Sequence, residues 1–151
     1  MVGKSAYSAV GNGAIILSIP SAPFNLENDA LVSGKSEIKF DWYEPLETGG
    51  TTILDYRVYS DLGNPTGTFH ILESNVPSAT YTAVGLSKGV AYRFKVAARN
   101  SVGYSALSSE VSILAAEEPS KPIEPLTTLS GPNVVIQWAA PSDGGSAILS
   151  Y

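Results

Sequence analysis

The chain has 151 residues, 44% of them hydrophobic and 15% charged, and a formal net charge of −5. It contains no cysteine, so it can form neither a disulfide framework nor a thiolate metal site. It has no basic run, and its apolar run at residues 14–19 is far shorter than the ~20 residues that cross a bilayer. The negative net charge without a basic run argues against nucleic-acid binding, and the short apolar run argues against membrane insertion.

The chain reads as a series of strands, because runs rich in Val, Ile, Tyr, Thr and Phe alternate with clusters of Gly, Pro, Asn and Ser. In chain order we expect strands at 14–19, 24–27, 37–43, 53–60, 68–72, 80–83, 90–99 and 107–114. The strand at 90–99 alternates most regularly and presents one apolar face and one largely polar face. In the strand at 53–60 we expect Asp55 and Arg57 to face solvent with Leu54 buried, because burying an unpaired charge is costly. The pattern predicts an all-β sandwich or barrel.

Part of the sequence occurs twice. Trp42 and Trp138 lie 96 positions apart and both begin a Trp-x-x-Pro string, which is followed by Gly-Gly and then by Ile-Leu-x-Tyr. A Pro-Ser-x-Pro linker precedes each copy, at 20–23 and at 119–122. The string at residues 10–14 also resembles residues 102–106, which come before the last strand of the first copy. We therefore expect a tail of a preceding repeat at 1–19, one complete unit at 20–118, and the truncated N-terminal part of a second unit at 119–151.

These residues carry a resemblance to the fibronectin type III domain. Trp42 stands where the family has the tryptophan of its second strand, and Leu86 and Tyr92 match its tyrosine corner. The matches continue through the next strand and its turn, at Phe94, Val96, Ala98, Asn100 and Gly103. The resemblance implies a seven-stranded antiparallel Ig-like β-sandwich with Greek-key connections, sheet A-B-E facing sheet C-C′-F-G. The residues expected to build its core are Trp42, Tyr56, Leu86, Tyr92, Phe94, Val96 and Trp138.

The sequence offers little to a catalytic or metal site. His70 is the only histidine, and no Gly-x-Ser-x-Gly nucleophile motif is present. The carboxylates Asp41, Glu44 and Glu47 flank one loop, where a solvated surface explains them better than acid–base chemistry does. A calcium site built from Asp61, Asn64 and Asp143 lacks the usual clustered ligands. We expect no enzyme activity, no cofactor, no metal and no small-molecule substrate.

Binding surfaces are expected where sandwiches usually carry them, in the end loops and at a free sheet edge. The loops are 44–52, 74–78 and 100–104, and Tyr104 is the aromatic residue that we would test as a protein contact. The alternative is that Tyr104 packs on the last strand of its own unit. The lead interpretation is a non-catalytic structural link in a tandem array, with neighbouring repeats and other proteins as partners.

Two contexts stay open for such an array. The Gly-Gly and Ile-Leu-x-Tyr string looks like repeats of giant intracellular scaffolds, and it also occurs in receptor ectodomains. The second interpretation is therefore an accessory repeat of a secreted enzyme, or an ectodomain repeat of a receptor or adhesion protein. Residues 119–151 hold only two strands and the start of a third, so we expect this part to be mobile unless a neighbour covers Trp138.

Overall fold

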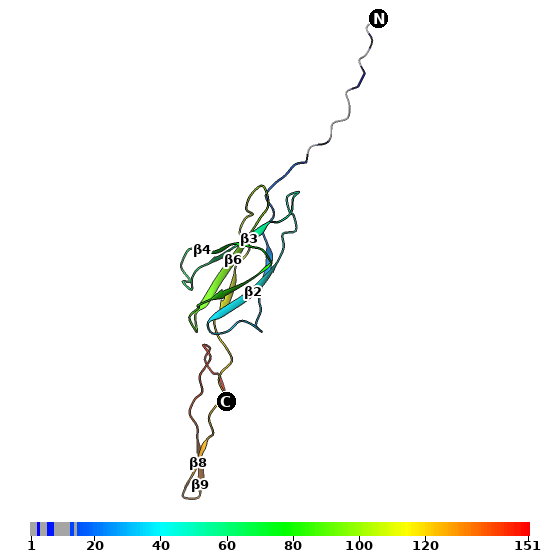
Figure 1. Ribbon diagram of the computed structural model, residues 1–151. Coiled ribbons are helices and arrows are strands. Elements are labelled where there is room, and N and C mark those ends of the chain that lie inside the picture. Colours follow the sequence, from blue (N-terminus) through cyan, green and yellow to red (C-terminus); the bar gives the residue numbers. More distant parts are fainter. Residues whose placement is uncertain (1–2, 4–5, 8–12, 14) are drawn as a thin grey trace.

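The computed structural model describes residues 3, 6–7, 13 and 15–151, and these residues form nine strands and no helix (Figure 1). The first seven strands are β1 (Phe24–Asn28), β2 (Glu37–Tyr43), β3 (Asp55–Ser60), β4 (His70–Val76), β5 (Thr80–Val84), β6 (Ala91–Arg99) and β7 (Val111–Leu114). A separate hairpin follows, made of β8 (Leu126–Ser130) and β9 (Asn133–Gln137).

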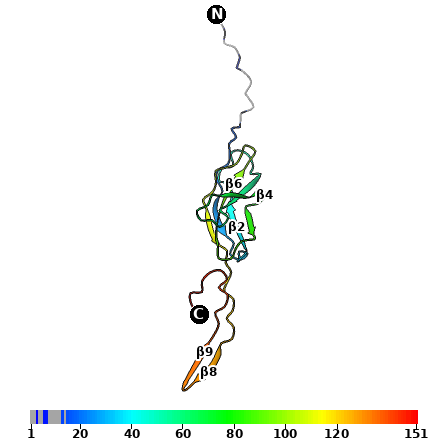
Figure 2. The same ribbon diagram turned by 90° about the vertical axis from the view of Figure 1, so that its left-hand side faces the viewer.

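The seven strands form two layers, seen on edge in Figure 2. One sheet has the order β1-β2-β5 and the other the order β4-β3-β6-β7, with every neighbouring pair antiparallel. The sheets therefore correspond to A-B-E and C′-C-F-G, which confirms the predicted Ig-like sandwich. The β8–β9 hairpin extends from the end of the sandwich opposite to the N-terminal segment (Figure 1).

The core lies between the sheets and is built around aromatic rings. Phe40 of β2 stacks on Phe94 of β6 with ring centroids 4.6 Å apart, and both side chains are fully buried. Trp42 is 3% exposed and meets Tyr56 edge to face at 5.3 Å. These pairs join the two layers, and truncating a buried tryptophan typically costs ~3–5 kcal/mol.

Tyr92 fixes the crossover between β5 and β6. Its ring is 8% exposed, and its hydroxyl oxygen accepts a hydrogen bond from the Ser87 backbone N–H at 2.9 Å. The neighbouring Leu86 packs against the core and donates its backbone N–H to the Ser36 carbonyl at 3.0 Å. One side-chain bond and one backbone bond thus hold the loop that passes from one sheet to the other.

The prediction for the face of β3 is wrong at Asp55. Asp55 is only 7% exposed, whereas Leu54, which we expected in the core, is 55% exposed. The carboxylate of Asp55 is buried because it pairs with the guanidinium of Arg99, whose Nε donates to Asp55 Oδ1 at 3.0 Å. A charge with a partner escapes most of the penalty that an isolated buried charge would bear.

Several strand boundaries also differ from the expected ones. The last strand is shorter than 107–114. Ser108 Oγ accepts the Val96 N–H and Ser105 Oγ accepts the Ala98 N–H, each at 3.0 Å, so before β7 two serine hydroxyls stand where a regular ladder would have backbone carbonyls. Residues 15–19, expected as a strand, form none. Residue 14 and most of the string at 10–14 lie outside the described residues.

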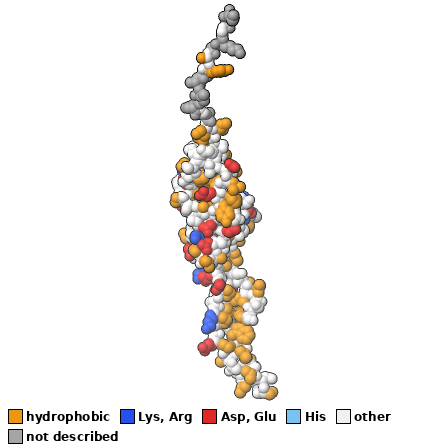
Figure 3. All heavy atoms as spheres, turned by 90° about the vertical axis from the view of Figure 1, so that its right-hand side faces the viewer, with side chains coloured by type: hydrophobic (Ala, Val, Ile, Leu, Met, Phe, Trp, Pro, Cys, Tyr) orange, Lys and Arg blue, Asp and Glu red, His pale blue; other side chains and the backbone are white. Residues whose placement is uncertain are grey.

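The β8–β9 hairpin has no second sheet packed on it within the described part of the chain. Its strands are paired in register from Leu126 opposite Gln137 to Ser130 opposite Asn133, and most of their residues are exposed. Trp138, expected as a core residue, is 52% exposed and touches Tyr151 edge to face at 5.9 Å. Hydrophobic side chains accordingly show on the surface of this region (Figure 3).

Candidate functional site

The N-terminal segment is fastened to the B–C loop, the turn between β2 and β3 at residues 44–54, by a short backbone ladder. The Ser18 N–H donates to the Gly49 carbonyl at 3.0 Å, and the Ser21 N–H donates to the Glu47 carbonyl at 2.8 Å. The Glu47 N–H donates in return to Ser21 Oγ at 3.1 Å. We call this set of three bonds the linker clamp.

Asn100, at the start of the loop after β6, holds the same region together. Its side-chain amide donates to the carbonyls of Ser18 and Thr48 at 2.7 and 2.8 Å. Its Oδ1 accepts the backbone N–H groups of Val102 and Gly103 at 2.9 and 3.1 Å. With 2% exposure, Asn100 is a buried polar residue that connects the linker, the B–C loop and the F–G loop at residues 100–104.

A second copy of the linker clamp lies at the other end of the sandwich. The Glu117 N–H donates to the Gly144 carbonyl at 2.8 Å, and the Ser120 N–H donates to the Ser142 carbonyl at 2.9 Å. The Ser142 N–H donates to Ser120 Oγ at 2.9 Å. Each donor and acceptor takes the position that its counterpart has in the first clamp, so the repeated sequence folds into a repeated set of bonds.

Glycine is required at the centre of both clamps. Gly49 and Gly144 have φ angles of +74° and +67°, in the region that favours glycine. A Cβ at Gly49 would lie 2.0 Å from the Ser18 carbonyl oxygen, and a Cβ at Gly144 would lie 1.9 Å from the Glu117 carbonyl oxygen. Any side chain at these positions would push the linker off the loop.

The second clamp also lies against the end of the sandwich, beside the turn before β6 and the end of β7. A Cβ at Gly145 would lie 3.1 Å from both the Ala115 carbonyl oxygen and the Gly89 nitrogen, so the two backbones are in close contact. Lys88 Nζ lies 2.8 Å from Asp143 Oδ1 across this contact. The hydrogen bond from Lys88, followed by the Gly145 N–H, holds the pKa of Asp143 below its usual value. Both charged side chains are about half exposed, so water screens the ion pair and it adds little to stability.

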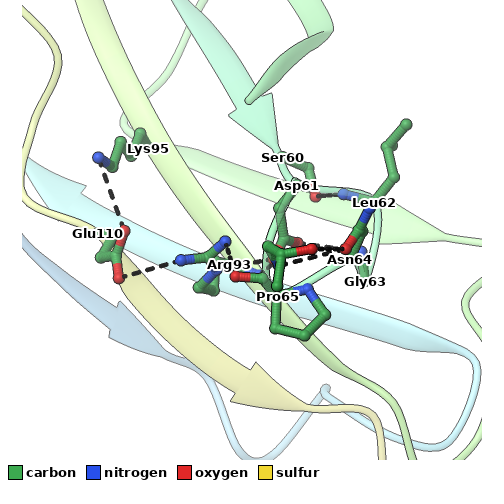
Figure 4. A network of polar contacts seen from close by, with 10 residues as sticks. Ser60, Asp61, Leu62, Gly63, Asn64, Pro65, Arg93, Lys95 and Glu110 are labelled. Atoms are coloured by element: carbon green, nitrogen blue, oxygen red, sulfur yellow. Dashed lines mark hydrogen bonds and ion pairs between the residues drawn. The ribbon is translucent and has the colours of Figure 1, made fainter. Parts of the chain in front are cut away.

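A second polar surface covers the outer face of the four-stranded sheet. The three arginines of the chain, Arg57, Arg93 and Arg99, all lie on β3 and β6. Arg93 Nε donates to Asp61 Oδ2 at 2.8 Å, and its Nη2 donates to the Pro65 carbonyl at 2.8 Å (Figure 4). Glu110 lies 3.7 Å from Arg93 and 3.6 Å from Lys95, which extends the network toward β7.

Tyr104 lies on this surface between two guanidinium groups. The Arg57 guanidinium carbon is 4.0 Å from the centre of the Tyr104 ring, and that of Arg99 is 5.4 Å away. The Tyr104 backbone forms a bridge with Arg99, and its side chain is partly buried. The ring therefore packs on arginines of β3 and β6, and its use as a protein contact stays a prediction.

The structure does not bring the other candidate residues together. His70 is exposed, and its Nε2 lies 3.2 Å from Thr68 Oγ1. Asp61 is paired with Arg93, whereas Asp143 is paired with Lys88. No group of three or more His, Cys, Asp or Glu side chains that could hold a metal ion occurs among the described residues. Within the same residues, no helix could span a membrane.

The clamps are not expected from the sequence, although the strings that form them are visible in it. In the sequence, Ser21 and Ser120 stand out only as parts of Pro-Ser-x-Pro linkers, and the Gly-Gly pairs only as parts of the repeated string. The signal that could have found the clamps was that both strings recur together: Gly49 follows Ser21 by 28 residues, and Gly144 follows Ser120 by 24.

Comparison with known proteins agrees with this architecture. The family model described as "Fibronectin type III domain" matches residues 21–114. A Kelch domain-containing protein of Saccharolobus solfataricus is 38% identical over 79 residues, which are 51% of this chain and 11% of that protein. Titin of Drosophila melanogaster is 32% identical over 144 residues, 90% of this chain and 1% of titin.

A solved structure described as domains A168–A170 from titin aligns with a TM-score of 0.59 at 21% identity, covering 67% of this chain and 34% of that one. At this identity the likeness supports the sandwich fold and nothing finer. The chain spans about a tenth or less of the curated relatives named above.

Proposed function

Because this chain belongs to the fibronectin type III family, we propose that it is a non-catalytic link in a tandem array, which holds successive repeats in a fixed orientation and serves as a protein-interaction module. In this proposal, residues 1–19 are the tail of a preceding repeat, 20–118 the complete unit and 119–151 the start of the next. The neighbouring repeats of the same chain are its first partners.

The recurrence of the linker clamp carries this proposal. A flexible spacer would leave its backbone unbonded. Here, in contrast, N–H groups of both linkers donate hydrogen bonds to the loop that follows each linker, at 44–54 and at 142–146. The contact of Gly145 with Gly89 and Ala115 adds a direct joint between units. These bonds restrict the rotation that an unbonded linker would leave free.

A glycine substitution in the second clamp tests the orienting role. We expect residues 115–121 and 142–146 of the full chain to share one molecular alignment with β6 in NMR residual dipolar couplings. Gly144→Ala should abolish that shared alignment, because its Cβ would collide with the Glu117 carbonyl. The matched control is Gly34→Ala, since a Cβ at Gly34 meets nothing within 4 Å.

Independent alignment of the second unit in the unsubstituted chain would refute the orienting role. So would a Gly144→Ala chain that keeps the shared alignment. In either case the tandem arrangement would remain, and the linker would be a flexible tether.

A further inference from the structure

The sandwich has four sheet edges, and three of them carry features that discourage the pairing of another strand. The pairing of β1 shifts between Phe24 and Glu27, and β4 is irregular at two places in its pairing with β3. Strand β7 has only four residues and contacts β1 at the same side of the sandwich. Bulges, short strands and mutual cover are the usual protection of exposed edges.

The fourth edge, β5, has none of these features. Its five residues, Thr-Tyr-Thr-Ala-Val, include no charge, proline or glycine, and they pair with β2 without a shift from Thr80 to Val84. Strand β5 hydrogen-bonds to β2 alone. It is therefore a regular edge strand whose outer side has no partner strand among the described residues.

The register identifies the backbone groups that face outward. In an antiparallel ladder, residues alternate between those bonded to the neighbour and those turned away from it. The Trp42 N–H donates to the Ala79 carbonyl at 3.0 Å, which places Tyr81 and Ala83 on the bonded side in the same register. Thr80, Thr82 and Val84 therefore point their N–H and C=O groups away from β2.

A groove of about 450 Å³ runs beside the start of this edge, between the end of β4 and the start of β5. Its lining includes Glu73, Asn75, Pro77, Thr80, Tyr81 and Thr82. Thr80 Oγ1 is buried without a hydrogen-bond partner among the described residues. The groove gives the side chains of an added strand a place to lie.

The charge around this edge is negative. Glu37 and Asp41 stand on β2 opposite Val84 and Thr80, and Glu73 lies across the groove. None of these three carboxylates takes part in an ion pair within the part of the chain that the structure describes. Lys39, the cation on β2 between them, is engaged by Asp29 at 2.8 Å.

We propose that the free edge of β5 binds an extended basic segment of another polypeptide, which adds as a further strand to the three-stranded sheet. The N–H and C=O groups of Thr80, Thr82 and Val84 bond its backbone. Glu37, Asp41 and Glu73 attract lysine or arginine at alternate positions of the segment. This surface is separate from both linker clamps, so the proposal does not depend on the orienting role.

The test uses the full chain and a synthetic peptide in which Lys and Val alternate. Backbone amide chemical shifts should change most at Thr80, Thr82 and Val84 as the peptide is added. A peptide with Glu in place of Lys should not bind. The same Lys-Val peptide can be N-methylated at alternate residues, which removes the backbone N–H groups along one side of the strand. We expect this methylated peptide to bind about tenfold more weakly or not at all, because it loses several backbone hydrogen bonds to β5.

A pair of variants tests the edge from the protein side. Thr82→Pro removes an outward N–H that no strand uses, and we expect it to weaken binding about tenfold. Thr82→Ala keeps the backbone donor and should bind as the unsubstituted chain does. If Thr82→Pro does not fold, the N-methylated peptide makes the same comparison on the unaltered protein.

Equal affinity for the methylated and unmethylated peptides would overturn the proposal, because it would show general charge attraction. Binding that leaves the amides of β5 unshifted would overturn it as well. Self-association of the chain through β5 that excludes the peptide would replace the proposed occupant with a second copy.

Discussion

Asp61→Asn separates the charge of a buried carboxylate from its hydrogen bonds. Asp61 has no exposed side-chain surface, and its Oδ1 accepts the backbone N–H groups of Gly63 and Arg93, each at 3.0 Å. Its Oδ2 accepts from Arg93 Nε, at 2.8 Å (Figure 4). An asparagine that places its oxygen at the Oδ1 position keeps both backbone bonds and turns its amide toward a guanidinium donor.

The expected loss of stability depends on the hydrogen-bond and ion-pair partners that Arg93 keeps after the substitution. Removing one partner of a fully buried ion pair costs ~3–5 kcal/mol. Arg93 is 23% exposed and still has Glu110 and the Pro65 carbonyl within reach, so part of this loss is recovered. We expect Asp61→Asn to lower the free energy of unfolding by about 2 kcal/mol, measured by urea titration at neutral pH.

The same substitution should change the acid response. Burial raises the pKa of Asp61, but the hydrogen bonds from Arg93 and Gly63 outweigh it and hold the pKa below its ordinary value. A carboxyl with a lowered folded pKa stabilises the protein fully above the unfolded pKa of about 3.9 and loses that contribution as pH falls through the folded value. Asp61→Asn should therefore remove part of the stability loss below pH ~4.

Asp41→Asn is the matched control, because Asp41 is exposed and has no ion pair among the described residues. It should change the unfolding free energy by less than ~0.5 kcal/mol. If Asp61→Asn costs no more than this control and keeps the full acid dependence, the buried carboxylate does not stabilise the fold through Arg93.

Three further outcomes are expected. Tyr92→Phe leaves the Ser87 N–H without its acceptor and should cost ~1–3 kcal/mol in urea unfolding; an unchanged midpoint would contradict the role given to that bond. Burial raises the pKa of Tyr56 to about 12, and the charge of Glu44 adds to this effect, so the phenol should ionise near pH 12 in an ultraviolet titration. Because the folded pKa is above the unfolded value of about 10, the free energy of unfolding should fall as the pH rises from about 10 to about 12. Amides of β8 and β9 should exchange with deuterium far faster than those of β6, because the hairpin lacks a covering sheet; equal protection would contradict this.

Local pattern predicted most of the sandwich. The alternation at 90–99 and the tryptophan at 42 fixed the faces of two central strands, because each apolar side chain there needs cover whatever its neighbours are. The same logic failed at Asp55, since its burial depends on Arg99, a residue 44 positions away that periodicity does not reveal. The free-energy cost of burying a charged side chain therefore cannot be judged from that residue alone when a partner distant in the sequence neutralises it.

The surfaces were less accessible from the sequence than the core. The linker clamps are mainly bonds between backbone groups, and almost any residue carries those groups, so only the glycines and serines of the repeat hinted at them. Tyr104 stands out in the sequence as an aromatic residue in a loop, but its place between two guanidinium groups follows only from the tertiary structure.

The two glycine-centred clamps have a mechanical consequence. In the proposed array, the loop that binds each linker would belong to the unit after that linker, so each unit would supply the binding loop for the linker that precedes it. In a long array of such units, a change of a few degrees at one junction would displace each later unit in proportion to its distance from that junction. A single methyl group added at position 49 or 144 would therefore displace the neighbouring unit least and the most distant unit most.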